Sequence, residues 1–293
     1  MIKRLARISQ DKGWVFWVTA AAALMSTGTV VTLFLYLLKE SFPIVQAQGA
    51  SFLTGSDWVV GEVYGALPMI LGSVLVTTLA LILVLPLALG TALFTSEFLG
   101  PRWRWVVKSM MELLAGVPGI LYGLLGVALL AVWVRDVFGL IDGNTLFTAG
   151  VLLAVMILPT IMTLSEDALR AVPGEYRQTA WSLGLTRWET VTGVILPKAL
   201  PGICGAVFLG LGRAMGETIA VMLVIGGLDR IPEPWYNLFS SGQSIPSKLG
   251  REAAEALGTD LQWHALMALG CVLFLLVMAI TLTGHLLLPR QKS

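Results

Sequence analysis

Arg213, Glu217 and Thr218 are the residues of this chain whose types and spacing could do chemistry within a membrane. They lie in residues 199–228, a stretch that is otherwise apolar and long enough to cross a bilayer. A charge at membrane depth is costly, so it normally faces protein or water, pairs with another group and marks a pathway. The spacing of four puts the side chains of Arg213 and Glu217 on one helix face. The pair therefore predicts either a gate or binding point for a small ion, or an ion pair that only locks two helices together.

Composition sets the class of protein to which this stretch belongs. Hydrophobic residues make up 56% of the chain, charged residues make up 13%, and the mean hydropathy is +0.83. Soluble domains contain about 25% charged residues. The composition therefore predicts an integral membrane protein. Cys204 and Cys271 lie in apolar segments without metal-ligand spacing, so neither a metal site nor a disulfide framework is expected.

Windows without Asp, Glu, Lys or Arg divide the chain into membrane spans. Each window reaches the roughly 20 residues that a helix needs to cross the hydrocarbon core. The windows are residues 13–38, 63–96, 113–134, 143–165 and 261–289. Together with residues 199–228 they predict an all-α fold of six transmembrane helices. One transmembrane domain is expected over residues 13–288, with short tails at residues 1–12 and 289–293.

The distribution of basic residues predicts the orientation. Of the 19 Lys and Arg residues, 13 fall on the side of the two termini, five fall on the other side, and Arg213 lies within a span. Because Lys and Arg concentrate in cytoplasmic loops, both termini are expected in the cytoplasm. On the outer side, residues 229–260 are first rich in Pro, Gly and Ser and then become compatible with a helix. This segment predicts a short surface helix over residues 247–257.

The inner loop of residues 170–198 is the second segment that needs an explanation. It begins with a turn at Pro173 and Gly174, continues as a polar helix-compatible stretch, breaks at Gly184, and ends with an amphipathic stretch at Pro197. This pattern predicts two short helices, joined by a turn, on the cytoplasmic surface. A long ordered loop is usually functional, and two projecting helices suit the groove of a partner protein.

Residue spacing in this loop resembles the EAA loop of ABC importer permeases. That pattern is Glu-Ala-Ala, three residues, Gly, nine residues, Ile, one residue and Leu-Pro. The Gly and the Leu-Pro are in register here, whereas Gln178, Thr179 and Val194 replace Glu, Ala and Ile. The resemblance implies that the loop couples to an ATPase, although the carboxylate of the pattern is missing at Gln178. The implied coupling residues are Glu175, Gln178, Thr179, Ala180, Gly184, Leu196 and Pro197.

Further blocks resemble the permeases of phosphate importers. The blocks are SFLTGSDW (51–58), YGALPMILGS (64–73), MELLAGVPGILYG (111–123), LSEDALRAVP (164–173) and GRAMGETIAVMLVIGG (212–227). The last block is more similar to PstC-type subunits than to PstA-type subunits, and the similarity extends over about residues 10–288. It implies a type I ABC importer permease fold in the bacterial inner membrane.

This resemblance also implies partners. They are a second permease of the PstA type, two copies of a cytoplasmic ABC ATPase, a periplasmic or extracellular phosphate-binding protein and membrane lipid, but no nucleic acid. The chain contains no GxxxxGK[ST] phosphate loop. ATP and Mg²⁺ are therefore expected on the ATPase, and this chain is expected to be a transport subunit and not an enzyme.

For a phosphate substrate, Arg213 offers a planar fork of donors that matches two anion oxygens. Glu217 is expected to pair with Arg213 in the empty pathway and to weaken the hold on the anion. Thr218 offers a further hydroxyl ligand unless it bonds to its own helix. Other tetrahedral oxyanions, such as arsenate, remain alternatives. A stand-alone secondary anion transporter is less favoured, since internal repeats and broken helices in both halves are not evident in the sequence.

Overall fold

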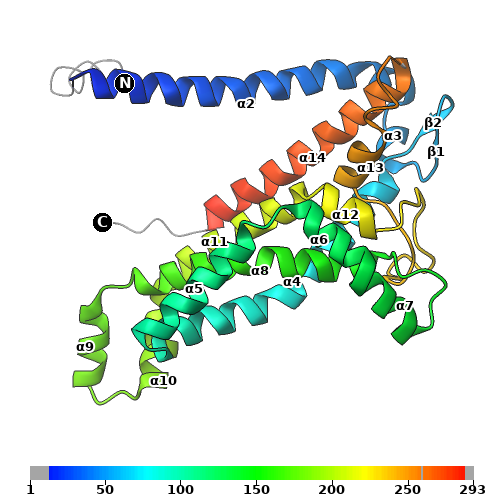
Figure 1. Cartoon of the computed structure of the whole chain (residues 1–293). Helices are drawn as coiled ribbons and strands as arrows, with labels where there is room; N and C mark the ends of the chain where they lie inside the picture. Colours follow the sequence, from blue (N-terminus) through cyan, green and yellow to red (C-terminus); the bar gives the residue numbers. More distant parts are fainter. Residues whose placement is uncertain (1–12, 259, 288–293) are drawn as a thin grey trace.

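The computed structural model describes residues 13–258 and 260–287, and most of them are helical (Figure 1). In this part of the chain, six helices or uninterrupted series of helical segments are long and apolar enough to cross a membrane. They are α2 (Gly13–Gln48); α4 (Leu67–Leu93) with the π-helical segment η1 (Phe94–Phe98); α6 (Gly119–Leu125), η2 (Gly126–Ala131) and α7 (Val132–Phe138); α8 (Leu146–Arg170); α10 (Arg187–Thr190), η3 (Val191–Ile195) and α11 (Leu196–Gly216); and α14 (Asp260–Leu287). The prediction of six transmembrane helices is confirmed.

Helix α8 forms the centre of the bundle, with α4 and α11 packed beside it (Figure 1). In its most apolar window 67% of the residues are buried, the largest share among the six. On α4, small and β-branched residues recur every four positions and are buried; they are Val76, Ala80, Val84, Ala88 and Ala92. Such residues let helices approach closely without strong hydrophobic forces between them. This core holds α11, which carries Arg213, against α8.

Helix α2 lies largely apart from this bundle. In Figure 1 it extends away from the other helices, and most of its contacts with other helices are with α14. The rings of Phe34 on α2 and Phe274 on α14 stack with their centroids 4.9 Å apart. None of the most apolar window of α2 is buried within the chain. The helix also extends beyond the predicted span of residues 13–38, because it continues through Lys39 and Glu40 to Gln48.

Two predicted spans have different boundaries in the structure. The window of residues 113–134 overlaps α5 (Pro101–Ala115), a charged helix that ends before the membrane helix begins at Gly119. The cause is Pro118, because proline disfavours the helical conformation of the residue before it. The predicted span over residues 199–228 is also wrong, and this difference affects the proposed site. It is divided into α11 and a separate short helix, α12 (Ile219–Val224).

The outer segment also differs from its prediction. A short helix, α3 (Ser51–Thr54), precedes a two-stranded hairpin of β1 (Trp58–Val59) and β2 (Val63–Tyr64), and the later helix α13 spans Ile245–Glu252. The predicted surface helix over residues 247–257 is present in part, but it ends at Glu252 and does not lie wholly at the surface, because Ser247 and Lys248 are fully buried. A capping box formed by Ser244 and Ser247 satisfies the first backbone groups of α13 without water. The start of α13 can therefore insert between α4, α12 and α14.

Candidate translocation and coupling sites

The helix that carries Arg213 ends inside the predicted span of residues 199–228. α11 stops at Gly216, Glu217 has an extended ψ of 117°, and α12 starts at Ile219. Pairing at a spacing of four requires a continuous helix, and the break removes that condition. No ion pair joins Arg213 and Glu217 among residues 13–258 and 260–287. The predicted pair is therefore wrong, because the two side chains do not share one helix face.

Arg213 bonds to two other helices instead. Its Nη1 donates to Thr160 Oγ1 on α8 at 2.9 Å, and its Nη2 donates to the carbonyl oxygen of Ala115 at 3.2 Å. Ala115 is the last residue of α5, where backbone carbonyls have no partner within the helix. A guanidinium has five N–H donors, and these contacts use only two of them. The side chain is exposed in the single chain, so the remaining donors can bind an anion.

Glu217 belongs to the helix break itself. Its Oε1 accepts a hydrogen bond from the backbone N–H of Ala220 at 3.2 Å, in the first turn of α12. It also lies against Gly119 at the start of α6, where a Cβ atom would be 2.8 Å from Oε1. The carboxylate thus lies between the starts of two helices, where partial positive charge favours it. Its negative charge is stabilised there without Arg213.

Thr218 and helix α13 complete the surroundings of the break. Thr218 Oγ1 donates to the carbonyl oxygen of Gly216 at 3.3 Å, which is the local bond that the sequence analysis left open. Gly250 on α13 faces the Thr218 methyl group, since a Cβ atom at Gly250 would be 2.6 Å from Thr218 Cγ2. The next residue, Arg251, donates from Nη2 to the carbonyl oxygen of Met222 at 2.7 Å. Helix α13 therefore covers the break on the side of α12.

A buried lysine anchors α13 and was missed in the sequence analysis. The Lys248 side chain is 0% exposed and forms ion pairs with Asp229 and Glu252. Its Nζ also lies 4.6 Å from the ring centroid of Trp58. A buried ammonium is tolerated when it is paired and hydrogen-bonded in this way. The spacing of four between Lys248 and Glu252 was a visible signal, but nothing in the sequence indicates the contacts with Asp229 or Trp58.

The coupling loop is a helix, a tight turn and a second helix, as predicted. Helix α9 (Gly174–Ser182) ends where the N–H of Gly184 bonds to the carbonyl of Trp181 at 3.0 Å and that of Leu185 bonds to Ala180 at 3.1 Å. This Schellman ending needs a residue with positive φ, and Gly184 has a φ of 79°. Thr186 then starts α10 with a capping box. The predicted bend at Gly184 is confirmed.

The second helix of the loop is not separate from the membrane domain. α10 continues through η3 into α11, which makes one membrane-length helical segment from Arg187 to Gly216. Pro197 lies in the first turn of α11, directly after the wide π-helical turn of η3. Such a turn accommodates proline, which lacks an N–H group and crowds the carbonyl four residues earlier. The backbone therefore shows no break at residue 198, and the helical segment that begins in the loop carries Arg213 near its other end.

The predicted coupling residues fall into two groups. Five of them are exposed and available to a partner; they are Glu175, Gln178, Thr179, Gly184 and Pro197. Ala180 is buried and Leu196 is half-buried, so these two pack the loop against the rest of the chain.

Arg177, next to Gln178, ties the loop to η1, the π-helical segment that continues α4. Its Nη2 and Nε donate to the two carboxylate oxygens of Glu97 at 2.7 and 3.3 Å. The same guanidinium donates to the carbonyl oxygens of Val172 and Leu169 at 2.8 and 3.1 Å. A bidentate arginine–carboxylate contact is directional as well as strong. The Arg177–Glu97 brace was missed in the sequence analysis, since nothing in the sequence indicates a contact between residues 80 positions apart.

A second ion cluster ties α5 to α8 at the same end. Lys108 pairs with Asp167 and, at 3.1 Å, with the fully buried Glu166. Burial alone would lower the pKa of Lys108, but hydrogen bonds and charge from Asp167 and Glu166 outweigh burial and raise this pKa. The stabilisation by this cluster is therefore fully present below the unfolded lysine pKa of about 10.4 and is lost only as the pH rises through the folded value.

Comparison with known proteins assigns this arrangement to a family. Residues 85–291 match the family described as binding-protein-dependent transport system inner membrane component. The chain belongs to this family. The match includes α8, the coupling loop and α11, which are the elements that hold Arg213. The chain is thus a multi-pass inner-membrane protein with the fold of an ABC importer permease.

Several relatives are similar over nearly their whole length. A phosphate transport system permease protein PstC from Pasteurella multocida is 40% identical over 266 residues, which cover 84% of this chain and 81% of that protein. The PstC protein of Mesorhizobium japonicum is 35% identical over 292 residues, 93% of this chain and 88% of that protein. The probable ABC transporter permease YqgH of Bacillus subtilis is 33% identical over 281 residues, 94% of this chain and 90% of that protein. The resemblance to PstC-type permeases is confirmed.

Solved structures support the fold at lower identity. A chain of a bacterial alginate ABC transporter, in complex with an alginate-bound periplasmic protein, aligns with a TM-score of 0.61 at 14% identity and covers 98% of both chains. A chain of the MetNI methionine ABC transporter in an inward-facing conformation aligns with a TM-score of 0.55 at 17% identity, over 74% of this chain and 89% of that chain. The predicted type I ABC importer permease fold is confirmed.

Proposed function

We propose that this chain is the PstC-type permease subunit of an ATP-driven inorganic phosphate importer and that it forms half of the translocation pathway. The observation that carries the proposal is Arg213, an exposed guanidinium with free donors beside a helix break in a membrane segment. The relatives named as phosphate transport permeases support phosphate as the anion.

The partners follow from the proposed function. A PstA-type permease supplies the other half of the pathway, two copies of a cytoplasmic ABC ATPase hold ATP and Mg²⁺, and a phosphate-binding protein delivers the substrate. The excess of basic residues on one side supports cytoplasmic termini, with residues 1–12 and 289–293 as tails and the coupling loop on the same side.

Coupling uses the two connections of the loop. The exposed residues Glu175, Gln178 and Thr179 contact the ATPase, and the closing ATPase dimer moves α9 as a rigid unit. The Arg177–Glu97 brace carries this movement to α4. The helical segment from Arg187 to Gly216 carries it to Arg213. Movement at the loop therefore reaches the proposed phosphate contact through continuous, tightly bonded elements.

At the site, Arg213 binds two oxygens of a partly dehydrated phosphate through its free N–H groups. Glu217 and Thr218 shape the site, because they form the break that ends α11 next to Arg213. The fixed negative charge of Glu217 keeps the phosphate weakly bound, so that it is released after the pathway opens on the other side.

Radiolabelled phosphate uptake by cells that carry the complete transporter tests this role. Arg213→Ala is expected to reduce uptake at least about tenfold, the loss from roughly 1.4 kcal/mol of charged contact, with assembly and ATPase binding unchanged. Arg213→Lys keeps the charge but loses the fork, so it is expected to fall between the wild type and Arg213→Ala. Arg135→Ala is the matched control, since Arg135 is an exposed arginine that pairs with Asp136 away from the break. Undiminished uptake in Arg213→Ala would contradict the proposed role of Arg213 as the phosphate contact.

A further inference from the structure

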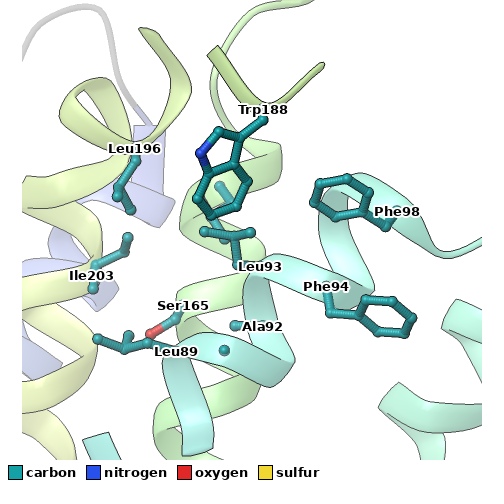
Figure 2. A pocket seen from close by; sticks show the side chains of 11 residues that line it. Leu89, Ala92, Leu93, Phe94, Phe98, Ser165, Trp188, Leu196 and Ile203 are labelled. Carbon is teal, nitrogen blue, oxygen red and sulfur yellow. The ribbon is translucent and has the colours of Figure 1, made fainter. Parts of the chain in front are cut away.

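An apolar groove of about 440 Å³ lies beside the coupling loop (Figure 2). It is bounded by the end of α4, the end of α8 and the segment from α10 to α11. Apart from Ser165, every residue that lines it is apolar or aromatic, including Leu89, Phe94, Trp188, Leu196 and Ile203. Gly90 also lines the groove, and nothing lies within 4 Å of the position that a Cβ atom would take there. The groove therefore has free space next to an exposed backbone position on α4.

A second cavity of about 250 Å³ adjoins the groove, and Phe98 lines both. Its walls combine apolar side chains such as Trp181 with the charged side chains of Glu97, Arg177 and Arg187. The charge of Glu97 is compensated by Arg177 through the brace. Arg187 is exposed and, among the residues that the structure describes, has no ion-pair partner. The second cavity therefore carries one uncompensated positive charge.

We propose that the groove and the adjoining cavity together bind one anionic phospholipid, with an acyl chain in the groove and the headgroup at Arg187. An apolar channel that leads to a basic cavity matches the order of chain and headgroup in such a lipid. Basic cavities between membrane helices on the cytoplasmic side are known sites for anionic headgroups, and tryptophans such as Trp181 and Trp188 favour the level of the headgroups. The uncompensated charge of Arg187 favours an anionic lipid over a zwitterionic one.

A lipid at this site would affect coupling, because the site lies between two elements that connect the loop to the membrane helices. One wall, with Trp188 and Leu196, belongs to the helical segment that leads to Arg213, and the opposite wall, with Leu89 and Phe94, belongs to α4 and η1. An acyl chain between these walls keeps the two elements at a fixed separation. The Arg177–Glu97 brace joins the loop to the same end of α4. The bound lipid would thus stiffen the connection through which the coupling loop acts.

Lipid retention by the complete transporter tests the site. The transporter is reconstituted in phosphatidylcholine with a minor fraction of phosphatidylglycerol and purified again in mild detergent, and the retained phosphatidylglycerol per transporter is measured by mass spectrometry. Gly90→Phe places a ring at the groove from a position where a Cβ atom meets nothing within 4 Å, and Arg187→Glu reverses the charge at the headgroup. Arg187→Glu is expected to lower retained phosphatidylglycerol about fivefold, the factor expected from one lost basic contact at a lipid surface. Gly90→Phe is expected to lower it to a similar extent, because its ring occupies the space of the acyl chain.

Two control variants separate this site from the general lipid surface. Gly28→Phe places the same ring at an open glycine on α2, and Arg102→Glu reverses an exposed charge on α5. Both are expected to retain phosphatidylglycerol at the wild-type level. Wild-type retention in Arg187→Glu or in Gly90→Phe would overturn the proposal, and so would an equal loss in the controls. Loss of the ATPase or the second permease from Gly90→Phe, with lipid retention unchanged, would also overturn it and assign the groove to a protein partner.

Discussion

Thr160 determines how Arg213 presents its free donors. It is the only side chain in the described part of the chain that accepts a hydrogen bond from the Arg213 guanidinium, at 2.9 Å. A flexible arginine binds an anion best when its fork is already oriented, because less side-chain entropy is then lost on binding. Thr160 is therefore a positioning residue for the proposed phosphate contact.

Thr160→Val keeps the shape of the side chain and removes the acceptor. Phosphate uptake at low phosphate concentration is expected to fall about tenfold, with a higher KM, because a hydrogen bond to a charged group contributes roughly 1.5 kcal/mol or more. The measurement is uptake against phosphate concentration. Thr163→Val is the control, since Thr163 Oγ1 bonds within its own helix to the carbonyl oxygen of Pro159. Equal effects of the two substitutions would show that Thr160 has no special role.

The charged residues of the site could be found from the sequence, but their contacts could not. Arg213 and Glu217 are evident as charges in an apolar stretch. Their separation is not evident, because residues 219–225 remain apolar and helix-compatible after the break. At the break, the Glu217 carboxylate lies against Gly119, a residue distant in the sequence that leaves room for it. A pattern within one segment cannot contain that information.

Among the elements, the junction between α9 and α4 decides whether movement of the loop reaches the membrane helices. The Arg177 and Glu97 side chains are only 19% and 11% exposed, so water screens their attraction weakly. Arg177→Glu is expected to reduce uptake at least about tenfold while the ATPase remains bound, because breaking a largely buried pair costs more than the roughly 1 kcal/mol of an exposed pair. Arg135→Glu, which breaks the pair with Asp136 between side chains that are 47% and 60% exposed, is expected to have little effect.

The exchanged pair makes this test specific. Glu97→Arg combined with Arg177→Glu restores the opposite charges but not the bonds to the carbonyl oxygens of Leu169 and Val172. Uptake per hydrolysed ATP is therefore expected to recover in part, and a double-mutant cycle gives the size of the coupling. If the exchanged pair performs no better than Arg177→Glu alone, the brace does not transmit the movement.

Elements differed in how well they could be predicted. Charge-free windows located the membrane helices, because composition alone makes such segments insoluble in water. The glycine at position 184 located the turn of the loop, since this turn requires a residue with positive φ. The burial of α13 could not be predicted, because the partners of Lys248 come from distant segments. The continuity of α10 with α11 was also missed, since Pro197 reads as a helix end unless the preceding turn is wide.

The molecule as a whole leaves its charged site uncovered. Arg213 is exposed in the single chain although it lies in a membrane segment. None of the residues in the most apolar window of α2 is buried within the chain. An arginine within a membrane helix costs up to about 3 kcal/mol on insertion scales, unless protein or water surrounds it. The exposed guanidinium therefore requires a covering partner, which is the role proposed for the second permease.

This cost predicts how the lone chain behaves. When the chain is expressed without the second permease, Arg213→Leu is expected to lengthen its half-life in the membrane severalfold, because the uncompensated charge is removed. The same substitution is expected to abolish phosphate uptake in the complete transporter. The measurement is a pulse-chase of the lone chain, with Arg135→Leu as the control because Arg135 already has a partner in Asp136. If Arg213→Leu decays as fast as the wild type, the exposed charge does not limit the lone subunit, and the need for a covering partner would have to come from the apolar surface of α2 instead.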